Sequence, residues 1–270
     1  MTANTALMAG KRGLVLGVAT DRSIAWGIAR RLAAHGARLA FTYQGEAFER
    51  RVRPLARSLD ADLVLPCDVD REEDLDRVFA ALGEAWDRLD FVVHAVAYSD
   101  KDELKGRYLD TTRANFARTL AISCYSFTAL ARRAAPLMTH GGGLLTLSYL
   151  GARRVTPNYN VMGVAKAALE TSVRYLAADL GGQGIRVNAI SAGPMRTLAG
   201  SAIADARFVY RWNQTHAPLA RNVTLDEVGG AARYLLSDLS AGVSGEIQFV
   251  DGGYNTVGIP SPARLNAGRT

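Results

Sequence analysis

Short apolar runs alternate with longer helical segments along almost the whole chain, and this alternation constrains the fold more than any other feature. The helical segments, with apolar residues at helical spacing, include 23–35, 70–86 and 158–180. The apolar runs are continuous, which is typical of parallel strands buried on both faces. The predicted strands are residues 13–16, 37–43, 63–67, 89–96, 143–148, 185–190 and 246–250.

This order of elements predicts an α/β fold, namely a single Rossmann-like doubly wound domain. Its seven-stranded parallel sheet would be flanked by helices joined through right-handed crossovers. A chain of 270 residues suits one such domain over 1–270, because neither a Pro/Ser-rich linker nor an internal repeat divides it. The polar, Pro-containing residues 259–270 are expected to form a loose C-terminal tail.

The cysteines and the net charge indicate the cellular location of the protein and the kinds of partner it can bind. Cys67 and Cys124 form no CxxC pair, so we expect no metal site, no disulfide framework and a reducing cytoplasmic location. No apolar run approaches the ~20 residues that span a bilayer, and no signal peptide is recognisable, so no membrane association is expected. The net charge of +6 comes from scattered arginines, which disfavours nucleic acid and would equally serve an acidic protein partner.

The turn after the first predicted strand has features of a dinucleotide site. The strand ends at Gly17, and the first helix is predicted to begin near Ser23 and Ile24, with Gly27 inside it. A helix N-terminus offers free N–H groups and a positive dipole end to a pyrophosphate. Ser23 is expected to cap this helix, and Gly27 to let it approach the sheet. Because G-x-G-x-x-G is absent, a tight turn without a ligand is the alternative.

The end of the second predicted strand bears on the choice between NADH and NADPH. Gln44 stands where many NAD-binding proteins carry an acidic residue, and Glu46 would repel a 2′-phosphate. No basic residue stands at the strand tip, so NADH is favoured. Arg50 and Arg51 would reverse this preference if they folded back toward the tip.

Asp68 and Val69 follow the third predicted strand. The Asp68 carboxylate can accept a hydrogen bond from an adenine amino group, while Val69 packs beside the ring. The alternative, compatible with the first, is that Asp68 caps the helix predicted to start near Asp70.

Tyr159 and Lys166 stand seven residues apart at the start of a predicted helix. Seven residues are close to two helical turns, so both side chains share one face with about 11 Å of rise between them. A hydroxyl donor stabilises an oxyanion where charge develops. A nearby ammonium is expected to lower the pKa of the phenol and to hold ribose hydroxyls. A helix-start aromatic and a solvated lysine are the alternative for any such pair.

Several collinear stretches together are far more specific than any one motif. They are GVATDRSIAWGIA, LAFTYQGE, LPCDV, LLTLSYLGARR, PNYNVMGVAKAALE, RVNAISAGPMRTLA and SDLSAGVSGEI. From about Lys11 to Gly253, the chain resembles the bacterial NADH-dependent enoyl-acyl-carrier-protein reductases, a divergent branch of the short-chain dehydrogenase/reductase family. The resemblance implies NADH-dependent reduction of the C2=C3 bond of trans-2-enoyl-acyl-carrier protein in type II fatty acid biosynthesis, by a homotetramer.

The resemblance also implies roles for individual residues. Tyr159 would contact the thioester carbonyl, Lys166 would be the catalytic lysine, and Tyr149 would serve in proton delivery or in positioning. Ser99 is the implied substrate contact. The implied contacts to NAD are Gly17, Ser23, Ile24, Gln44, Asp68, Val69, Val96, Lys166, Met195, Arg196, Thr197, Leu198 and Ala199.

The segment after the sixth predicted strand, residues 191–216, is expected to form a substrate lid. Gly193 and Gly200 could act as its hinges, Thr197 could hydrogen-bond a pyrophosphate or carboxamide, and Met195 could contribute to an apolar wall. A plain surface loop is the alternative.

Two other functions are compatible with this fold. Ordinary carbonyl reductases of the superfamily usually place their lysine four residues after the catalytic tyrosine, but Met162, which has no hydroxyl, stands four residues before Lys166. A non-catalytic NADH-binding regulator would keep the fold and lose the activity, and the retention of Tyr149, Tyr159 and Lys166 argues against it.

Overall fold

The structure, a computed structural model, describes residues 6–61, 63–201 and 204–261, so 262–270 of the predicted tail lie outside the described residues. The predicted seven-stranded sheet is confirmed, with all neighbours parallel in the order β3-β2-β1-β4-β5-β6-β7. The strands are β1 (Arg12–Leu16), β2 (Arg38–Tyr43), β3 (Leu63–Pro66), β4 (Phe91–His94), β5 (Gly142–Ser148), β6 (Ile185–Ala192) and β7 (Ile247–Val250).

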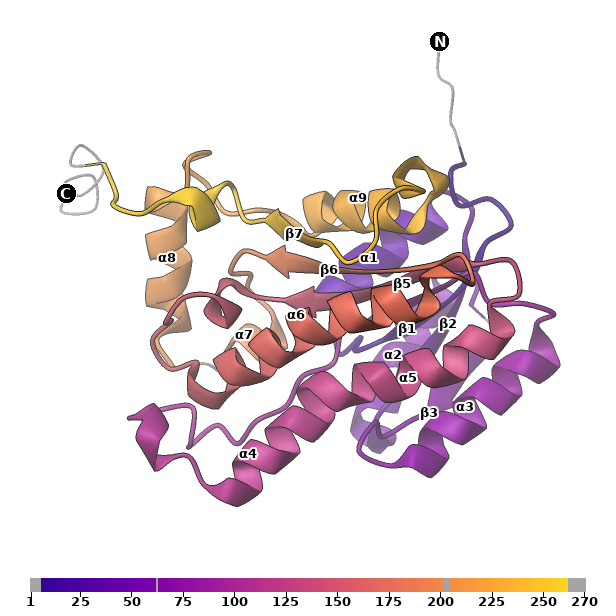
Figure 1. The fold of residues 1–270 in the computed structure, drawn as a ribbon, viewed down its shortest axis with the longest axis horizontal. Helices are drawn as coiled ribbons and strands as arrows, with labels where there is room; N and C mark the ends of the chain where they lie inside the picture. The colour runs from indigo at the N-terminus through magenta and orange to yellow at the C-terminus, as the bar shows by residue number, and fades with distance from the viewer. Residues whose placement is uncertain (1–5, 62, 202–203, 262–270) are drawn as a thin grey trace, which may run out of the picture.

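Helices cover both faces of the sheet (Figure 1). One face carries α1 (Ile24–Ala33), α2 (Gly45–Arg57) and α9 (Leu225–Leu236), and the other carries α3 (Glu72–Ala85), α5 (Ser126–Ala134) and α6 (Asn160–Gly181). The remaining helices are α4 (Arg113–Leu120), α7 (Leu198–Ser201), α8 (Ala206–His216), the π-helix η2 (Ala121–Tyr125) and the 3₁₀ segments η1 (Tyr108–Asp110), η3 (Ala135–Leu137), η4 (Leu150–Ala152), η5 (Asp238–Ser240) and η6 (Tyr254–Thr256).

The helices form because each buries an apolar stripe against the sheet. In α1, Ile28, Ala29 and Leu32 are fully buried, as expected of an amphipathic helix. Helix α9 begins with a capping box between Thr224 and Glu227, a feature worth about 1 kcal/mol. No described helix is long and apolar enough to cross a membrane.

The strand order reverses between β1 and β4, which are hydrogen-bonded neighbours. Successive crossovers leave this point in opposite directions, so a crevice opens at the carboxyl ends of the two strands. Figure 1 shows α7 and α8 at the same end of the sheet. The fold therefore places the turn after β1, the loop after β4 and the segment after β6 around one region.

A buried polar cluster lies between the sheet and the π-helix. The His94 ring nitrogens lie 2.9 Å from Thr146 Oγ1 and 2.8 Å from Ser126 Oγ, and Ser126 Oγ donates to the carbonyl of Ile122. Because Ser126 donates to Ile122, it accepts from Nε2–H, while Thr146 Oγ1 lies within hydrogen-bond distance of both Nδ1 and the His94 carbonyl oxygen. Burial, followed by the charge of Lys166, lowers the pKa of His94 from 6.5 to about 3, so the ring is neutral.

This neutral histidine predicts acid sensitivity. Below pH 6.5 the unfolded chain protonates His94 while the folded chain does not, so the free energy of unfolding falls as pH drops toward about 3. His94→Asn cannot take up this proton and should reduce the slope by up to ~1.4 kcal/mol per pH unit. Urea unfolding between pH 7 and 4.5 measures the slope. The exposed His140 provides the control, His140→Asn, and equal slopes in the two variants would contradict the prediction.

Candidate active site

The turn after β1 depends on a glycine. Gly17 has φ +94, and a Cβ there would lie 2.0 Å from the Ala95 carbonyl oxygen at the end of β4. Ser23 occupies the N-cap position of α1, but its Oγ accepts from the amides of Ala19 and Thr20, at 3.0 Å each, and makes no capping bond. The expectation that its side chain caps the helix is therefore wrong, because the hydroxyl folds the preceding turn.

The N-terminus of α1 suits an anion. Its first turn contains no acidic residue, and the amides of Ile24 and Ala25 have no protein acceptor among the described residues. Free amides and the positive dipole end fit a pyrophosphate.

Gly27 was expected to let α1 approach the sheet, but the structure shows a different contact. A Cβ at Gly27 would lie 2.8 Å from Leu225 Cβ, so this glycine permits close packing on α9.

The end of β2 leaves little positive charge for a 2′-phosphate. Gln44 is exposed and precedes α2 at its N-cap position. Arg50 pairs with Glu46 at 3.6 Å, and the Arg51 guanidinium lies 6.0 Å from the Phe48 ring centroid. Both arginines thus have contacts within α2, which supports the preference for NADH.

Asp68 and Val69 follow β3 and are half-buried. Asp68 Oδ1 accepts from the amide of Asp70 at 3.0 Å, and α3 begins only at Glu72 with Arg71 at its N-cap. The alternative that Asp68 caps α3 is therefore wrong. Val69 packs against the core beneath the sheet. Asp68 Oδ2 accepts no hydrogen bond from the described residues, so it can accept one from a ligand.

The predicted catalytic residues gather where β5 ends and α6 begins. Tyr159 immediately precedes α6, and its ring makes an edge contact with Tyr149 at 5.1 Å between centroids. Lys166, two turns along α6, donates through Nζ to the carbonyl of Leu147 at 2.7 Å. Met162, four residues before Lys166, packs in the same buried cluster as Tyr159. Its thioether side chain has no hydroxyl that could replace a catalytic tyrosine.

Burial sets the protonation of all three groups. It raises the pKa of Tyr159 well above its usual range and that of Tyr149 to about 12, so both phenols carry their protons at neutral pH. Burial lowers the pKa of Lys166 to about 8, against the opposing effects of Cys124 and Glu170. The expectation that Lys166 lowers the pKa of Tyr159 is wrong here, because burial dominates and the amine binds the Leu147 carbonyl.

The loop after β4 is held by a buried polar stripe on α4 and η2. Thr119 Oγ1 donates to Ser99 Oγ at 3.0 Å, Asn115 Oδ1 accepts from the amide of Asp100, and Ser123 Oγ accepts from the amide of Tyr98. Ser99, the predicted substrate contact, is thus itself anchored by protein groups. Val96, before it, is half-buried against the core.

The segment after β6 crosses the same end of the sheet. Met195 packs against the core, the Arg196 guanidinium lies 4.7 Å from the Tyr210 ring centroid, and Thr197 Oγ1 accepts from the amide of Gly200. Leu198 and Ala199 are in α7. Met195 and Arg196 also line a hollow of about 210 Å³ with Arg22, from the turn after β1. The structure therefore brings this segment to the predicted pyrophosphate turn.

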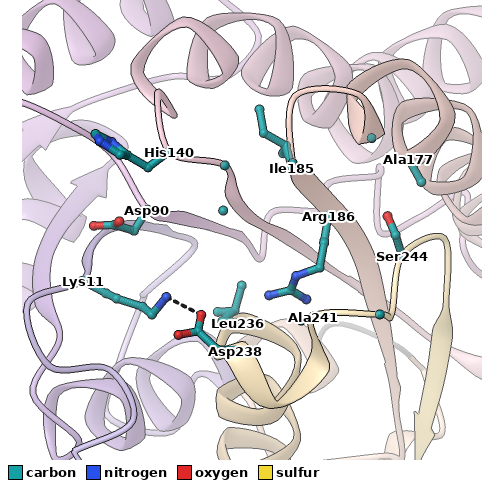
Figure 2. Close-up of a pocket in the computed structure, with 15 residues that line it drawn as sticks. Lys11, Asp90, His140, Ala177, Ile185, Arg186, Leu236, Asp238, Ala241 and Ser244 are labelled. Atoms are coloured by element: carbon teal, nitrogen blue, oxygen red, sulfur yellow. Dashed lines mark hydrogen bonds and ion pairs between the residues drawn. The ribbon is translucent and has the colours of Figure 1, made fainter.

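A larger cavity, of about 440 Å³, is lined by none of these residues. Figure 2 shows the side chains that line it. Its lining includes Lys11, Asp90, Gly142 and Ile185, which stand at or before the first residues of β1, β4, β5 and β6. It is thus at the amino ends of the strands, whereas the catalytic candidates are at the carboxyl ends. Volume alone does not locate the active site in this fold.

Known proteins match the chain over nearly its whole length. A family model described as enoyl-(acyl carrier protein) reductase matches residues 17–255. The chain belongs to this family. It is 64% identical to the enoyl-[acyl-carrier-protein] reductase [NADH] 2 of Rhizobium meliloti, over 94% of this chain and 95% of that protein.

Two solved structures of reductases in the family have the same fold as this chain. The reductase of Anaplasma phagocytophilum in complex with NAD is 58% identical, with a TM-score of 0.91 over 95% of this chain and 96% of the other. The Bacillus cereus reductase with NADP+ and indole naphthyridinone is 51% identical, with a TM-score of 0.92 over 94% and 99%. The resemblance identified from the sequence motifs is confirmed.

Sequence reasoning missed two residues beside the reductase site. Glu170 lies one turn after Lys166 and is buried, and an acid at that spacing within an apolar helix face was the available signal. Gly151 permits the close approach of Tyr159, since a Cβ there would lie 2.4 Å from the Tyr159 ring. No signal in a single sequence marks this glycine, because the contact joins η4 to the residue that precedes α6.

Replacing Gly17 tests the turn. Gly17→Ala should lower the free energy of unfolding by ~2 kcal/mol or more and weaken NADH binding at least about tenfold, because Cβ meets the Ala95 carbonyl and φ is positive. Thermal unfolding and NADH fluorescence titration measure both effects. Gly10→Ala is the matched control, since Gly10 has φ +72 and open space around it. Similar losses in both variants would show that the contact with Ala95 is unimportant.

Proposed function

We propose that this chain reduces the C2=C3 double bond of a trans-2-enoyl-acyl-carrier protein with NADH, in the elongation cycle of type II fatty acid biosynthesis. The observation that carries the proposal is the grouping of two protonated tyrosines, Tyr149 and Tyr159, with buried Lys166 at the carboxyl end of β5. The names of the relatives, which are NADH-dependent enoyl-[acyl-carrier-protein] reductases, support it.

The tyrosines act in this mechanism as hydrogen-bond donors. When bound, NADH supplies the hydride that adds to C3 of the enoyl thioester. The thioester oxygen gains charge as the enolate forms, and the protonated Tyr159 donates a hydrogen bond to it inside a buried cluster. Tyr149 holds the Tyr159 ring by its edge contact. Lys166 would present its ammonium to the ribose hydroxyls of the bound cofactor, and C2 then takes up a proton that comes ultimately from solvent, which returns the enolate to a thioester.

The dinucleotide would be held by groups from every strand end around the crevice. Gly17, Ser23 and Ile24 accommodate the pyrophosphate, Gln44, Asp68 and Val69 the adenosine, and Val96 with residues 195–199 the nicotinamide end. Free amides at the α1 N-terminus support the first assignment. Because the Bacillus cereus relative was solved with NADP+, preference for NADH is tested directly by comparing the two cofactors.

The organisation of the molecule is part of the proposal. We assign residues 1–270 to one catalytic domain, with residues 191–216 as the substrate lid and Ser99 as a substrate contact. Exposed aromatics on adjoining elements, Tyr125 on η2 and Tyr175 on α6, support a homotetramer, which sedimentation can test. Free Cys67 and Cys124 fit a reducing cytoplasm. Exposed Arg207 and Arg211 on α8 suit an acidic acyl-carrier protein.

The decisive experiment follows NADH oxidation at 340 nm with crotonyl and longer trans-2-enoyl thioesters. Turnover with NADH, faster than with NADPH, is the expected result. Turnover of 3-oxoacyl substrates alone would favour a carbonyl reductase. NADH binding without turnover of either substrate would favour a non-catalytic regulator, and both of these results would overturn the proposal.

A further inference from the structure

Glu170 is a buried carboxylate that the proposed reaction does not use. It is 4% exposed, on the face of α6 that packs against the sheet. Ser148 Oγ donates to Oε1 at 2.7 Å, and Arg153 Nε donates to Oε2 at 2.9 Å. Both carboxylate oxygens are therefore engaged by residues outside the helix.

These two partners stand on either side of Tyr149. Ser148 is the last residue of β5 and immediately precedes Tyr149, whereas Arg153 follows η4 (Leu150–Ala152). The Arg153 guanidinium also lies 4.9 Å from the Phe249 ring centroid on β7. One carboxylate thus joins both ends of the segment that carries Tyr149.

Helix α6 also bonds to β5 at a second point, one turn before Glu170. Lys166 Nζ bonds the carbonyl of Leu147, directly before the Ser148 that Glu170 binds. Two successive turns of α6 therefore hold two successive residues of β5. The distance between the helix that carries Lys166 and the strand that leads to Tyr149 is fixed at both points.

Packing alone does not account for an acid in this place. A buried carboxylate loses its hydration, and a buried ion pair is often no more stabilising than apolar side chains of similar volume. An apolar residue at 170 could fill the space but could not hold Ser148 and Arg153 in fixed directions. Hydrogen bonds from a rigid helix supply this directional control.

We propose that Glu170 is a positioning residue that fixes Tyr149 against Tyr159 by anchoring Ser148 and Arg153. This inference rests on the proposed function. Without the anchor, the segment 148–153 can shift, and the edge contact between the two tyrosine rings is no longer held. Glu170 acts through the Tyr149 ring, so its removal has no further effect once that ring is absent.

A double-mutant cycle tests this dependence. Glu170→Gln keeps the shape of the side chain but retains only one acceptor oxygen. It is expected to lower kcat about tenfold or more, because small displacements of catalytic groups are costly, and to change the KM for NADH less than about twofold. In a Tyr149→Ala background, which lacks the ring, the same substitution is expected to lower kcat by less than about twofold.

Two further variants keep the test decisive. Asp90→Asn removes a comparable carboxylate, bound to Arg88 and to the amide of Arg12 at the opposite end of the sheet, and should leave kcat unchanged. Ser148→Ala removes one of the two anchors without altering charge, and it replaces Glu170→Gln if that variant does not fold. It should show the same dependence on Tyr149.

The outcomes separate this inference from the proposed function. No turnover by the unmodified protein would count against the proposed function. Turnover by the unmodified protein, with equal losses of kcat from Glu170→Gln in the presence and absence of the Tyr149 ring, would overturn the positioning role alone. So would an unchanged kcat accompanied by a loss of stability like that of Asp90→Asn.

Discussion

Replacing Tyr159 by phenylalanine is expected to lower kcat for enoyl thioester reduction by about 10²–10³-fold, the usual effect of removing one oxyanion donor. Burial raises the pKa of Tyr159 well above its usual range, so at neutral pH the phenol carries the proton that it donates. The substitution removes this donor and keeps the ring that contacts Tyr149. The loss should appear in kcat and kcat/KM together, with NADH affinity changed little, as measured at 340 nm.

Tyr234→Phe is the matched control, because Tyr234 is on α9, which covers the other face of the sheet, and its side chain is exposed. Because surface substitutions usually have small effects, this variant should change kcat by less than about twofold. If Tyr159→Phe behaved like this control, the phenol would not stabilise the developing oxyanion. Tyr149 would then be the first candidate to take its place.

The fold was predictable because its strands are buried on both faces. Continuous apolar runs such as Leu14–Leu16 and Phe91–Val93 have no polar alternation, and in the structure these residues are fully buried. Helix boundaries were less predictable. The helix predicted from Asp70 begins at Glu72. Asp68 Oδ1 accepts from the amide of Asp70, and this bond forms a turn before the helix.

The site was predictable where one element determines it. Tyr159 and Lys166 share a buried helix face because seven residues make about two turns, and both are buried. Contacts between distant elements were not predictable. The bond from Lys166 to the Leu147 carbonyl, the clamp of Glu170 on Arg153 and the packing of Gly27 on Leu225 all depend on how the layers meet.

Lys166→Met is expected to abolish turnover and, at the same time, to stabilise the fold. Burial lowers the pKa of Lys166 from 10.5 to about 8, which corresponds to a cost of roughly 3 kcal/mol for keeping the amine charged at neutral pH. The hydrogen bond to the Leu147 carbonyl offsets about 1 kcal/mol of this cost. Methionine has a similar shape and no charge, so urea unfolding at pH 7 should show a gain of about 2 kcal/mol.

The free energy of unfolding should also depend on pH through Lys166. The unfolded lysine keeps its proton up to about pH 10.5, whereas the folded amine releases it near pH 8. The unfolded chain therefore binds more protons between these values, and the free energy of unfolding of the unmodified protein rises with pH across that window. Lys166→Met should lose this rise. Lys105→Met, at an exposed lysine near Asp102, should keep it, and a variant at 166 that gained neither stability nor a flatter profile would show that the amine is well solvated in the folded protein.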